Sequence, residues 1–182
     1  PEVAGTAAVL ETLGLEIAVI EPPGTLDGGD VLQVDHGAGG SGTGSRVGSG
    51  AGSVVYVGRS GRTNDSGIAR LGELLRSRSR TVVPVEVRGV LHLKSAMTAL
   101  PDGTLVGHPD RVESSALPAL VVPPEESGAH VVVLDDTTVL MAASAPRSAE
   151  RLEERGLRVV RVDISEFEKL EGSVTCLSVL IR

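Results

Sequence analysis

The segment HVVVLDDTTVLMAASAPRSAERLEERGLRVVRVD, residues 130–163, carries the main fold signal of this chain. Its first part, HVVVLDDTTVLMAA, predicts a pair of strands. PRSAERLEERG, residues 146–156, predicts a helix, and LRVVRV, residues 157–162, predicts a further strand. The order is strand pair, helix, strand, which indicates an α/β protein.

The same order of elements occurs earlier in the chain. DVLQV (30–34) and VVYVG (54–58) predict a strand pair, TNDSGIARLGELLRSR (63–78) a helix with Thr63 or Asn64 as its cap, and TVVPV (81–85) a strand. Recurrence of this kind indicates a repeat architecture whose modules circle a shared axis. An ordinary doubly wound α/β sheet is the alternative, and the paired hairpins favour the repeat architecture over it.

The tract GAGGSGTGSRVGSGAGS, residues 37–53, separates the two strands of the earlier module. Because Gly and Ser dominate it, the tract cannot pack a core and is predicted to be a flexible loop. It is interpreted as an insertion at a hairpin tip, so residues 1–182 are predicted to form one domain. The other predicted elements are a helix over 1–14, a strand over 15–21, a hairpin over 92–109, a strand over 119–123, a short helix over 165–172 and a terminal strand over 172–182.

Composition excludes several functional classes. A formal net charge of −7 and a pI near 5.1 argue against a nucleic-acid partner, which needs clustered Lys and Arg. The apolar runs are too short to cross a bilayer, no cleavable leader opens the chain, and a cytoplasmic location is expected. The acidic and histidine residues lack metal-ligand spacing, and the glycine tract leads into a strand instead of a helix, so neither a metal nor a nucleotide site is predicted.

Cys176 is the only cysteine of the chain and lies on the predicted terminal strand. Taken alone, a single free cysteine is more often a buried, inert core residue than a nucleophile. One cysteine cannot form an internal disulfide. A nucleophilic cysteine would require a base and a substrate clamp elsewhere in the chain.

Four short motifs stand apart from the periodic background: TLDGGDV (25–31), GRSGRTN (58–64), GVLHLKS (89–95) and TCLSVLI (175–181). In this order they resemble the guanidine-modifying superfamily of arginine deiminases, amidinotransferases and dimethylarginine dimethylaminohydrolases, with the last as the best match. Each motif is weak alone, but four in order are specific. The resemblance implies a five-bladed α/β propeller, the pentein fold, of which this chain lacks the first module.

The resemblance also implies a role for five residues. Cys176 matches the nucleophile and His92 the general acid and base. Asp27 matches a carboxylate that supports both the guanidinium and the imidazole. Arg62 matches the residue that grips the α-carboxylate of the substrate, and Leu170 falls where the family uses a backbone carbonyl to hold the α-amine. These matches imply hydrolysis of a methylated arginine to citrulline and dimethylamine, without a metal or organic cofactor.

The chemistry of a guanidinium supports these roles. Its carbon is a poor electrophile because the charge is delocalised over three nitrogens, so attack requires a strong nucleophile, and a thiolate is one. The amine leaves only when it is protonated, which requires a residue such as histidine. Lys94, two residues after His92, matches the dimethylarginine hydrolases, because the deiminases and amidinotransferases typically carry an acid there. An arginine deiminase-like hydrolase and a non-catalytic binding module remain the alternatives.

Structural interpretations stand beside the functional ones. His92 could be a hydrogen-bonded strand histidine, Asp27 and Asp30 could be turn acids, and Arg62 could be a solvated charge before the helix. For the other histidines the structural interpretation is preferred, namely for His36, His108 and His130.

The resemblance further implies a longer family chain whose additional portion precedes Pro1. That portion contains the first module, further carboxylates and a second arginine of the substrate pocket. The 182-residue chain alone is therefore expected to be weakly active or inactive, and its expected partners are a small methylarginine or arginine-like substrate, the additional segment, or a second copy in a homo-oligomer.

Overall fold

The computed structural model describes residues 2–34 and 53–178. Its first module contains β1 (Val31–Val34), β2 (Val54–Arg59), α2 (Asp65–Arg76) and β3 (Thr81–Val87). β1 and β2 are antiparallel, whereas β2 and β3 are parallel. The predicted strand pair, helix and strand are thereby confirmed, as is the hairpin relation of the two strands that flank the glycine tract. The short strand β6 (Val112–Glu113) adds to β3 at the far edge.

The later module repeats this topology. β7 (Val132–Val133) and β8 (Thr138–Ala142) are antiparallel, α3 (Pro146–Glu154) follows, and β9 (Arg158–Val162) runs parallel to β8. The two modules therefore share both their element order and their strand directions. The recurrence predicted from the sequence is a property of the fold.

A hairpin lies between the two modules. β4 (Met97–Ala99) and β5 (Leu105–Gly107) are antiparallel, as the PDG turn predicted, and Val121 forms a parallel bridge to Val106 of β5. An antiparallel pair followed by a parallel neighbour thus occurs a third time, without a helix. The predicted strand over 119–123 is reduced to this one bridge.

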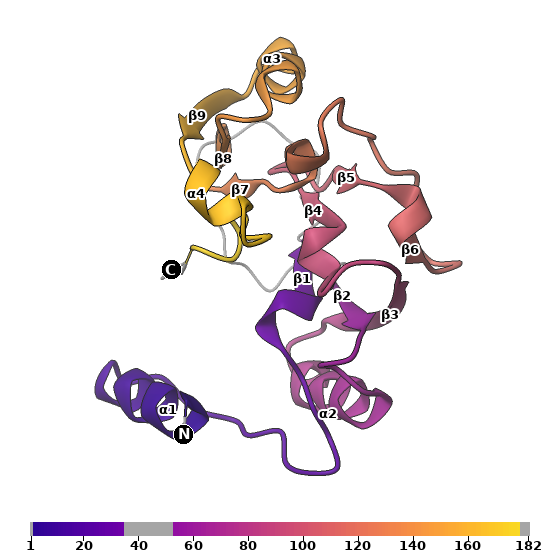
Figure 1. The fold of residues 1–182 in the computed structure, drawn as a ribbon. Coiled ribbons are helices and arrows are strands. Elements are labelled where there is room, and N and C mark those ends of the chain that lie inside the picture. Colours follow the sequence, from indigo (N-terminus) through magenta and orange to yellow (C-terminus); the bar gives the residue numbers. More distant parts are fainter. Residues whose placement is uncertain (1, 35–52, 179–182) are drawn as a thin grey trace.

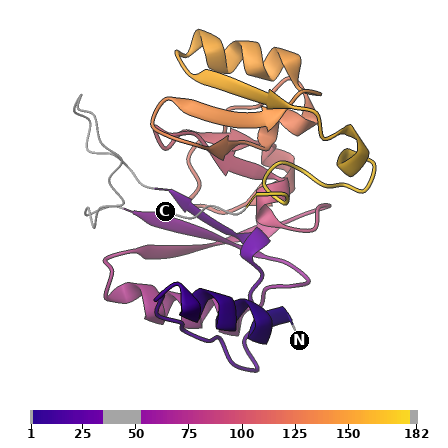
Figure 2. The same ribbon diagram turned by 90° about the vertical axis from the view of Figure 1, so that its left-hand side faces the viewer.

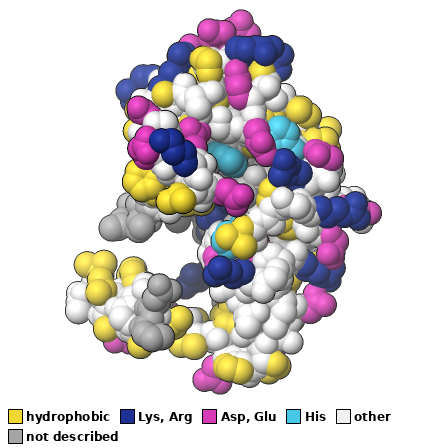
Figure 3. Space-filling model, viewed as in Figure 1, with side chains coloured by type: hydrophobic (Ala, Val, Ile, Leu, Met, Phe, Trp, Pro, Cys, Tyr) yellow, Lys and Arg dark blue, Asp and Glu magenta, His cyan; other side chains and the backbone are white. Residues whose placement is uncertain are grey.

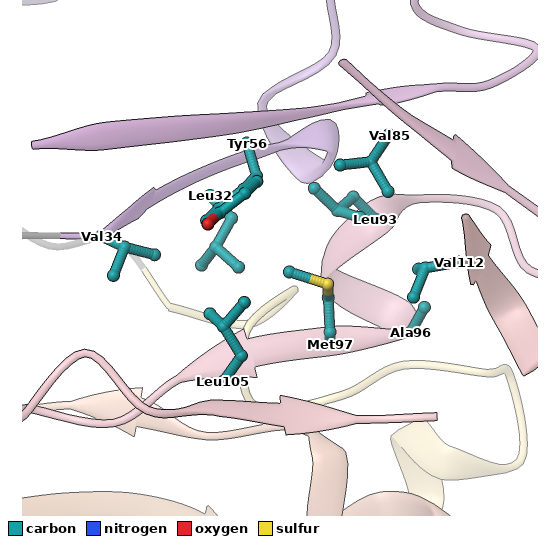
Figure 4. Close-up of a cluster of buried hydrophobic side chains, with 9 residues drawn as sticks. All are labelled: Leu32, Val34, Tyr56, Val85, Leu93, Ala96, Met97, Leu105 and Val112. Atoms are coloured by element: carbon teal, nitrogen blue, oxygen red, sulfur yellow. The ribbon is translucent and has the colours of Figure 1, made fainter. Parts of the chain in front are cut away.

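The three units are stacked with helices on the outside. Figure 2 shows α2 below the first sheet, the β4–β5 hairpin in the middle and α3 above the β7–β9 sheet. Alternate residues of the hairpin enter different cores: Met97 and Leu105 pack toward the first module, and Leu100 and Val106 toward the later one. Figure 4 shows the cluster between the first sheet and the hairpin, which contains Leu32, Val34, Tyr56, Val85, Leu93, Ala96, Met97, Leu105 and Val112.

Helix α2 is defined by its cap and its apolar stripe. Asn64 is the cap, and its side chain accepts a hydrogen bond from the Gly67 N–H at 2.9 Å. Ile68, Leu71 and Leu75 pack against β2 and β3. The loop that precedes α2, residues 60–64, is hydrogen-bonded to the turn at residues 25–30 that leads into β1.

The N-terminal part differs from the prediction. Helix α1 (Glu2–Thr12) forms, but residues 15–21 are not a strand, because no described segment runs beside them to pair with their backbone. Figure 1 shows α1 standing apart from the sheets. Hydrophobic side chains gather over this part of the surface in Figure 3; the exposed ones are Val3, Val9, Leu13, Leu15 and Val19.

The C-terminal part also differs. After α4 (Ser165–Glu168), the described residues 172–178 form a turn instead of the predicted strand, with the Cys176 N–H bonded to the Ser173 carbonyl at 3.0 Å. The glycine tract, apart from Ser53, and residues 179–182 lie outside the described residues, so the predicted flexible loop stays a prediction. No helix within the described ranges is both long and apolar enough for a membrane span.

Candidate active site

Asp27 begins the site at the turn that leads into β1. It caps the short 3-10 helix η1 (Gly28–Asp30), accepting a hydrogen bond from the Gly29 N–H at 2.9 Å. This bond lowers the pKa of the Asp27 carboxyl below its ordinary value; partial burial opposes the shift, and the nearby His92 and Arg62 add to it. Asp27 is therefore a carboxylate at neutral pH.

His92 lies directly before the 3-10 helix η2 (Leu93–Ser95), not on a strand as its structural interpretation assumed. Its Nε2 atom is 3.2 Å from Asp27 Oδ2, and its side chain is only 16% exposed. The two atoms are at ion-pair distance, but their orientation is not that of a hydrogen bond, and Nε2 has no hydrogen-bond partner among the described residues. A buried imidazole nitrogen with free hydrogen-bonding capacity is unusual and points to a functional role.

Gly29 makes the approach of the imidazole possible. A Cβ atom at this position would lie 2.6 Å from His92 Cγ and 2.8 Å from Nδ1, closer than real side chains come. The adjacent Gly28 has no heavy atom within 4 Å of the corresponding position. Of the two glycines in the DGGD motif, the second is the one that the packing of His92 requires.

Arg62 reaches the same carboxylate from the loop before α2. Its guanidinium Nη1 is 4.0 Å from Asp27 Oδ2, and its side chain is 59% exposed. A pair at this distance and exposure is weak. Arg62 is thus a cation beside the Asp27–His92 pair that can turn toward a ligand at little cost.

Cys176 lies on the C-terminal turn and is exposed, so its interpretation as a buried core residue is wrong. Its Sγ atom is 3.3 Å from the hydroxyl of Ser173, a buried residue, which in turn contacts the Thr175 hydroxyl at 2.8 Å. The turn itself is anchored because Val174 packs with Ile164 against the β7–β9 sheet. The thiol is therefore accessible on an ordered support.

Lys94 connects the cysteine turn with the Asp27 pair. Burial lowers the pKa of its ammonium group below the ordinary value, and the negative charges of Cys176, Asp27 and Asp30 act in the opposite direction. In Figures 1 and 2 the segment after α4 returns toward η2, which carries Lys94. Lys94 is therefore within electrostatic range of both the cysteine turn and the Asp27 pair.

Leu170 lies in the turn after α4. Its side chain is 84% exposed, and its N–H donates to the Phe167 carbonyl at 2.9 Å. The exposed side chain agrees with a role confined to the backbone, and the assignment of its carbonyl to a substrate amine stays a prediction.

The burial of Asp30 was not predicted from the sequence. Interpreted as a turn acid, Asp30 is in fact fully buried and accepts hydrogen bonds from the Ser60 and Thr63 hydroxyls and from the Leu93 N–H. The one available signal was the Val that follows it in LDGGDV, since an acid entering a buried strand needs partners.

Among the described residues, the other histidines and the acidic side chains form no second cluster that could hold a metal ion. His130 Nε2 is 3.0 Å from the Ser95 carbonyl, and His108 Nε2 is 3.5 Å from the Glu126 carbonyl. His36 lies outside the described residues. Within the described ranges, no group of three or more His, Cys, Asp or Glu side chains could hold a metal ion.

Comparisons with known proteins agree with the geometry. No family model matches the chain. A dimethylarginine dimethylaminohydrolase from Streptomyces coelicolor is 48% identical over 182 residues, which are all of this chain and 64% of that protein. One from Pseudomonas aeruginosa is 31% identical over 163 residues, or 87% of this chain and 57% of that protein.

A solved structure shows the same fold. The Pseudomonas aeruginosa enzyme, as a Cys→Ser mutant complexed with citrulline, superposes with a TM-score of 0.71 at 27% identity, covering 94% of this chain and 63% of the other. The chain thus spans less than two thirds of the length of these relatives. With identity at this level along its whole length, the chain is a homologue of the dimethylarginine dimethylaminohydrolases within the guanidine-modifying superfamily.

Proposed function

We propose that this chain carries the catalytic residues of a cysteine-dependent hydrolase that acts on the guanidinium carbon of Nω-methylated arginines. The observation that carries the proposal is the buried His92 Nε2 atom, which has no hydrogen-bond partner among the described residues and faces the Asp27 carboxylate at 3.2 Å. A histidine held in this way beside a carboxylate can move a proton. The exposed Cys176 supplies the nucleophile.

The first half of the reaction breaks a carbon–nitrogen bond. The Cys176 thiolate attacks the guanidinium carbon and forms a carbon–sulfur bond. The protonated His92 gives its proton to the dimethylamino nitrogen, and dimethylamine leaves with the electron pair of the broken bond. The product on the protein is a cationic S-alkyl thiouronium, in which the cysteine sulfur has replaced the amine.

The second half releases citrulline. The neutral His92 takes a proton from a water molecule, whose oxygen attacks the thiouronium carbon. The carbon–sulfur bond then breaks, the thiolate returns, and the loss of one further proton yields the ureido group of citrulline. One histidine serves as acid and then as base, so the net reaction consumes only water.

The ends of the substrate are assigned to different groups. Asp27 holds the guanidinium cation, and the exposed Arg62 turns to pair with the α-carboxylate, where a bidentate contact is available. The Leu170 carbonyl accepts from the α-amine. The presence of Lys94 supports methylated over unmethylated arginine as the substrate, because a lysine at this position is typical of the dimethylarginine hydrolases.

The architecture proposed for the complete protein is a five-bladed α/β propeller. Its support in this chain is the threefold occurrence of an antiparallel pair followed by a parallel neighbour. The remaining length of the relatives would supply the rest of the blades and further substrate contacts. The chain is accordingly one catalytic domain over 1–182, with residues 37–53 as a loop insertion.

Product analysis by mass spectrometry tests the function. The protein, expressed with the coding sequence that flanks this chain, is incubated in parallel with asymmetric dimethylarginine and with arginine, and Cys176→Ser is the control. We expect citrulline and dimethylamine from the first substrate, and neither from the variant.

Two other results would overturn the proposal. Citrulline and ammonia from arginine, at a higher kcat/KM than from dimethylarginine, would make the protein a deiminase. No product from either substrate, together with a Cys176 that resists iodoacetamide in the folded protein, would leave a binding module that has lost turnover.

A further inference from the structure

Asp30 is a buried carboxylate three residues after Asp27 of the candidate active site. Its Oδ1 atom accepts from the Leu93 N–H at 2.9 Å, and its Oδ2 atom accepts from the Ser60 hydroxyl at 2.6 Å and the Thr63 hydroxyl at 2.7 Å. These donors belong to η2 and to the loop before α2. A single side chain on η1 therefore joins three segments that are far apart in the sequence.

Each hydroxyl passes the interaction on to a residue of the site. The Ser60 hydroxyl accepts from the Arg62 N–H at 3.0 Å, and the Thr63 hydroxyl accepts from the Asp27 N–H at 3.0 Å. The third donor, the Leu93 N–H, belongs to the residue directly after His92. The backbone of Arg62 is thus connected to Asp30 through the Ser60 hydroxyl, and the backbone of Asp27 through the Thr63 hydroxyl. The backbone of His92 is connected to Asp30 through the N–H of the next residue, Leu93.

The chemistry of this arrangement favours one geometry. Hydrogen bonds to a carboxylate are roughly twice as strong as neutral ones, and a hydroxyl that donates to a charged group becomes a better acceptor for its own partner. A buried carboxylate is also costly if any donor moves away. The backbone of β2 closes the remaining space, because a Cβ atom at Gly58 would lie 2.7 Å from Asp30 Oδ1.

We propose that Asp30 is a positioning residue that sets the relative places of Asp27, Arg62 and His92. It acts on the acid–base pair through the Thr63 and Leu93 branches, and on the carboxylate-binding arginine through the Ser60 branch. This inference rests on the proposed function for its kinetic consequences, but the network itself is independent of turnover.

The two hydroxyl branches, through Ser60 and Thr63, can be removed separately by substitution. Ser60→Ala removes the link to Arg62, so KM for dimethylarginine should rise about fivefold with kcat within about twofold of the parent value. Thr63→Val removes the hydroxyl link from Asp30 to the Asp27 N–H and leaves the direct bond from the Asp30 N–H to the Asp27 carbonyl at 3.0 Å. We expect kcat to fall about tenfold, and Thr63→Ser, which keeps the hydroxyl, to restore it. Asp30→Asn offers one acceptor oxygen in place of two and should lower kcat/KM by at least about tenfold.

A matched control separates positioning from stability. Glu125 also accepts three hydrogen bonds, from the Arg147 and Ser148 N–H groups and the Ser148 hydroxyl, but it caps α3 in the later module. Glu125→Gln should lower the midpoint of thermal unfolding without changing kcat or KM. If Asp30→Asn, Ser60→Ala and Thr63→Val changed the kinetics no more than Glu125→Gln at equal loss of stability, Asp30 would be a structural residue only.

Amide NMR tests the network without any activity. Hydrogen exchange should speed up at the Arg62 amide alone in Ser60→Ala, at the Asp27 amide alone in Thr63→Val, and at the Leu93 amide as well in Asp30→Asn. This pattern in a protein that forms no citrulline would keep the network and refute the proposed function. If the parent protein formed citrulline but the exchange changes were uniform in all three variants, the proposed function would stand and the Asp30 network would be refuted.

Discussion

The close contact between Gly29 and His92 can be tested by adding a single methyl group, as a Gly→Ala substitution does. Gly29→Ala would place a Cβ atom 2.6 Å from the imidazole, so the ring must move away from Asp27. Gly28→Ala, one residue earlier, adds the same atom in open space. We expect Gly29→Ala to lower kcat by about tenfold or more and Gly28→Ala to change it less than about twofold, measured by citrulline formation. Equal effects of the two substitutions would contradict the placement of His92.

Substitutions of His92 and Arg62 should affect different steady-state parameters. His92→Ala removes the proposed proton donor of the chemical step, so kcat should fall by at least about a hundredfold with a smaller change in KM. Arg62→Ala removes the contact proposed for the α-carboxylate throughout the reaction, so the main effect should be a higher KM. An unchanged KM in Arg62→Ala would show that the α-carboxylate binds elsewhere.

The candidate site was predictable to the extent that its residues belong to motifs. Asp27, Arg62 and His92 lie in the short motifs that carry the family resemblance, and the structure places them together. Asp30 lies in the same DGGD motif, but a turn acid and a buried hydrogen-bond acceptor have the same local sequence. What distinguishes them is the hydroxyls of Ser60 and Thr63, thirty and thirty-three residues away.

Helix α2 contains two glycines, and alanine substitution is expected to change the free energy of unfolding in opposite directions at the two positions. A Cβ atom at Gly72 would only touch Val82 at 3.9 Å, so Gly72→Ala should stabilise the protein by about 0.5–1 kcal/mol through helix propensity. At Gly67 the same atom would lie 2.0 Å from the Thr25 carbonyl oxygen, so Gly67→Ala should destabilise by about 1–3 kcal/mol. Urea unfolding of both variants tests this; stabilisation by Gly67→Ala would mean that α2 does not pack on the turn at Thr25.

The short helix η2 is held from the later module by His130, whose ring contacts the Ser95 carbonyl at 3.0 Å. Burial lowers the pKa of His130; the Ser95 carbonyl, Glu126 and Glu168 oppose the shift, and His108 adds to it. As the pH falls below about 6.5, the unfolded chain binds the proton first, so this contribution to stability is present above that pH and is lost on acidification. The free energy of unfolding of wild type relative to His130→Gln should therefore decrease from pH 7.5 to 5.5, and an unchanged difference would contradict it.

At the level of elements, prediction succeeded where the signal is local. Helices α2 and α3 follow from their amphipathic patterns, and the three hairpins from apolar runs separated by turn residues. It failed at residues 15–21 and 172–178, which are apolar enough for strands. A strand also needs a neighbouring backbone, and the sequence of the segment does not say whether one is present.

At the scale of the whole molecule, the notable feature is the exposed apolar surface of α1 and residues 15–19. Val3, Val9 and Leu15 are exposed on a part of the chain that stands apart from the sheets, as Figures 1 and 3 show. The relatives carry more than a third of their length beyond the region matched here. A surface of this kind becomes buried when a further segment or a second copy packs on it.

We therefore expect the 182-residue chain, expressed on its own, to form citrulline at least about a hundredfold more slowly than the same chain with its flanking coding sequence, because substrate contacts outside it would be absent. Both proteins are assayed with dimethylarginine, each against its own Cys176→Ser variant, over a range of protein concentrations. A rate per chain that rises with concentration would mean that a second copy substitutes for the further segment. Equal rates for the two proteins at every concentration would contradict the expectation, because Asp27, Arg62, His92 and Cys176 would then suffice for turnover without the further segment.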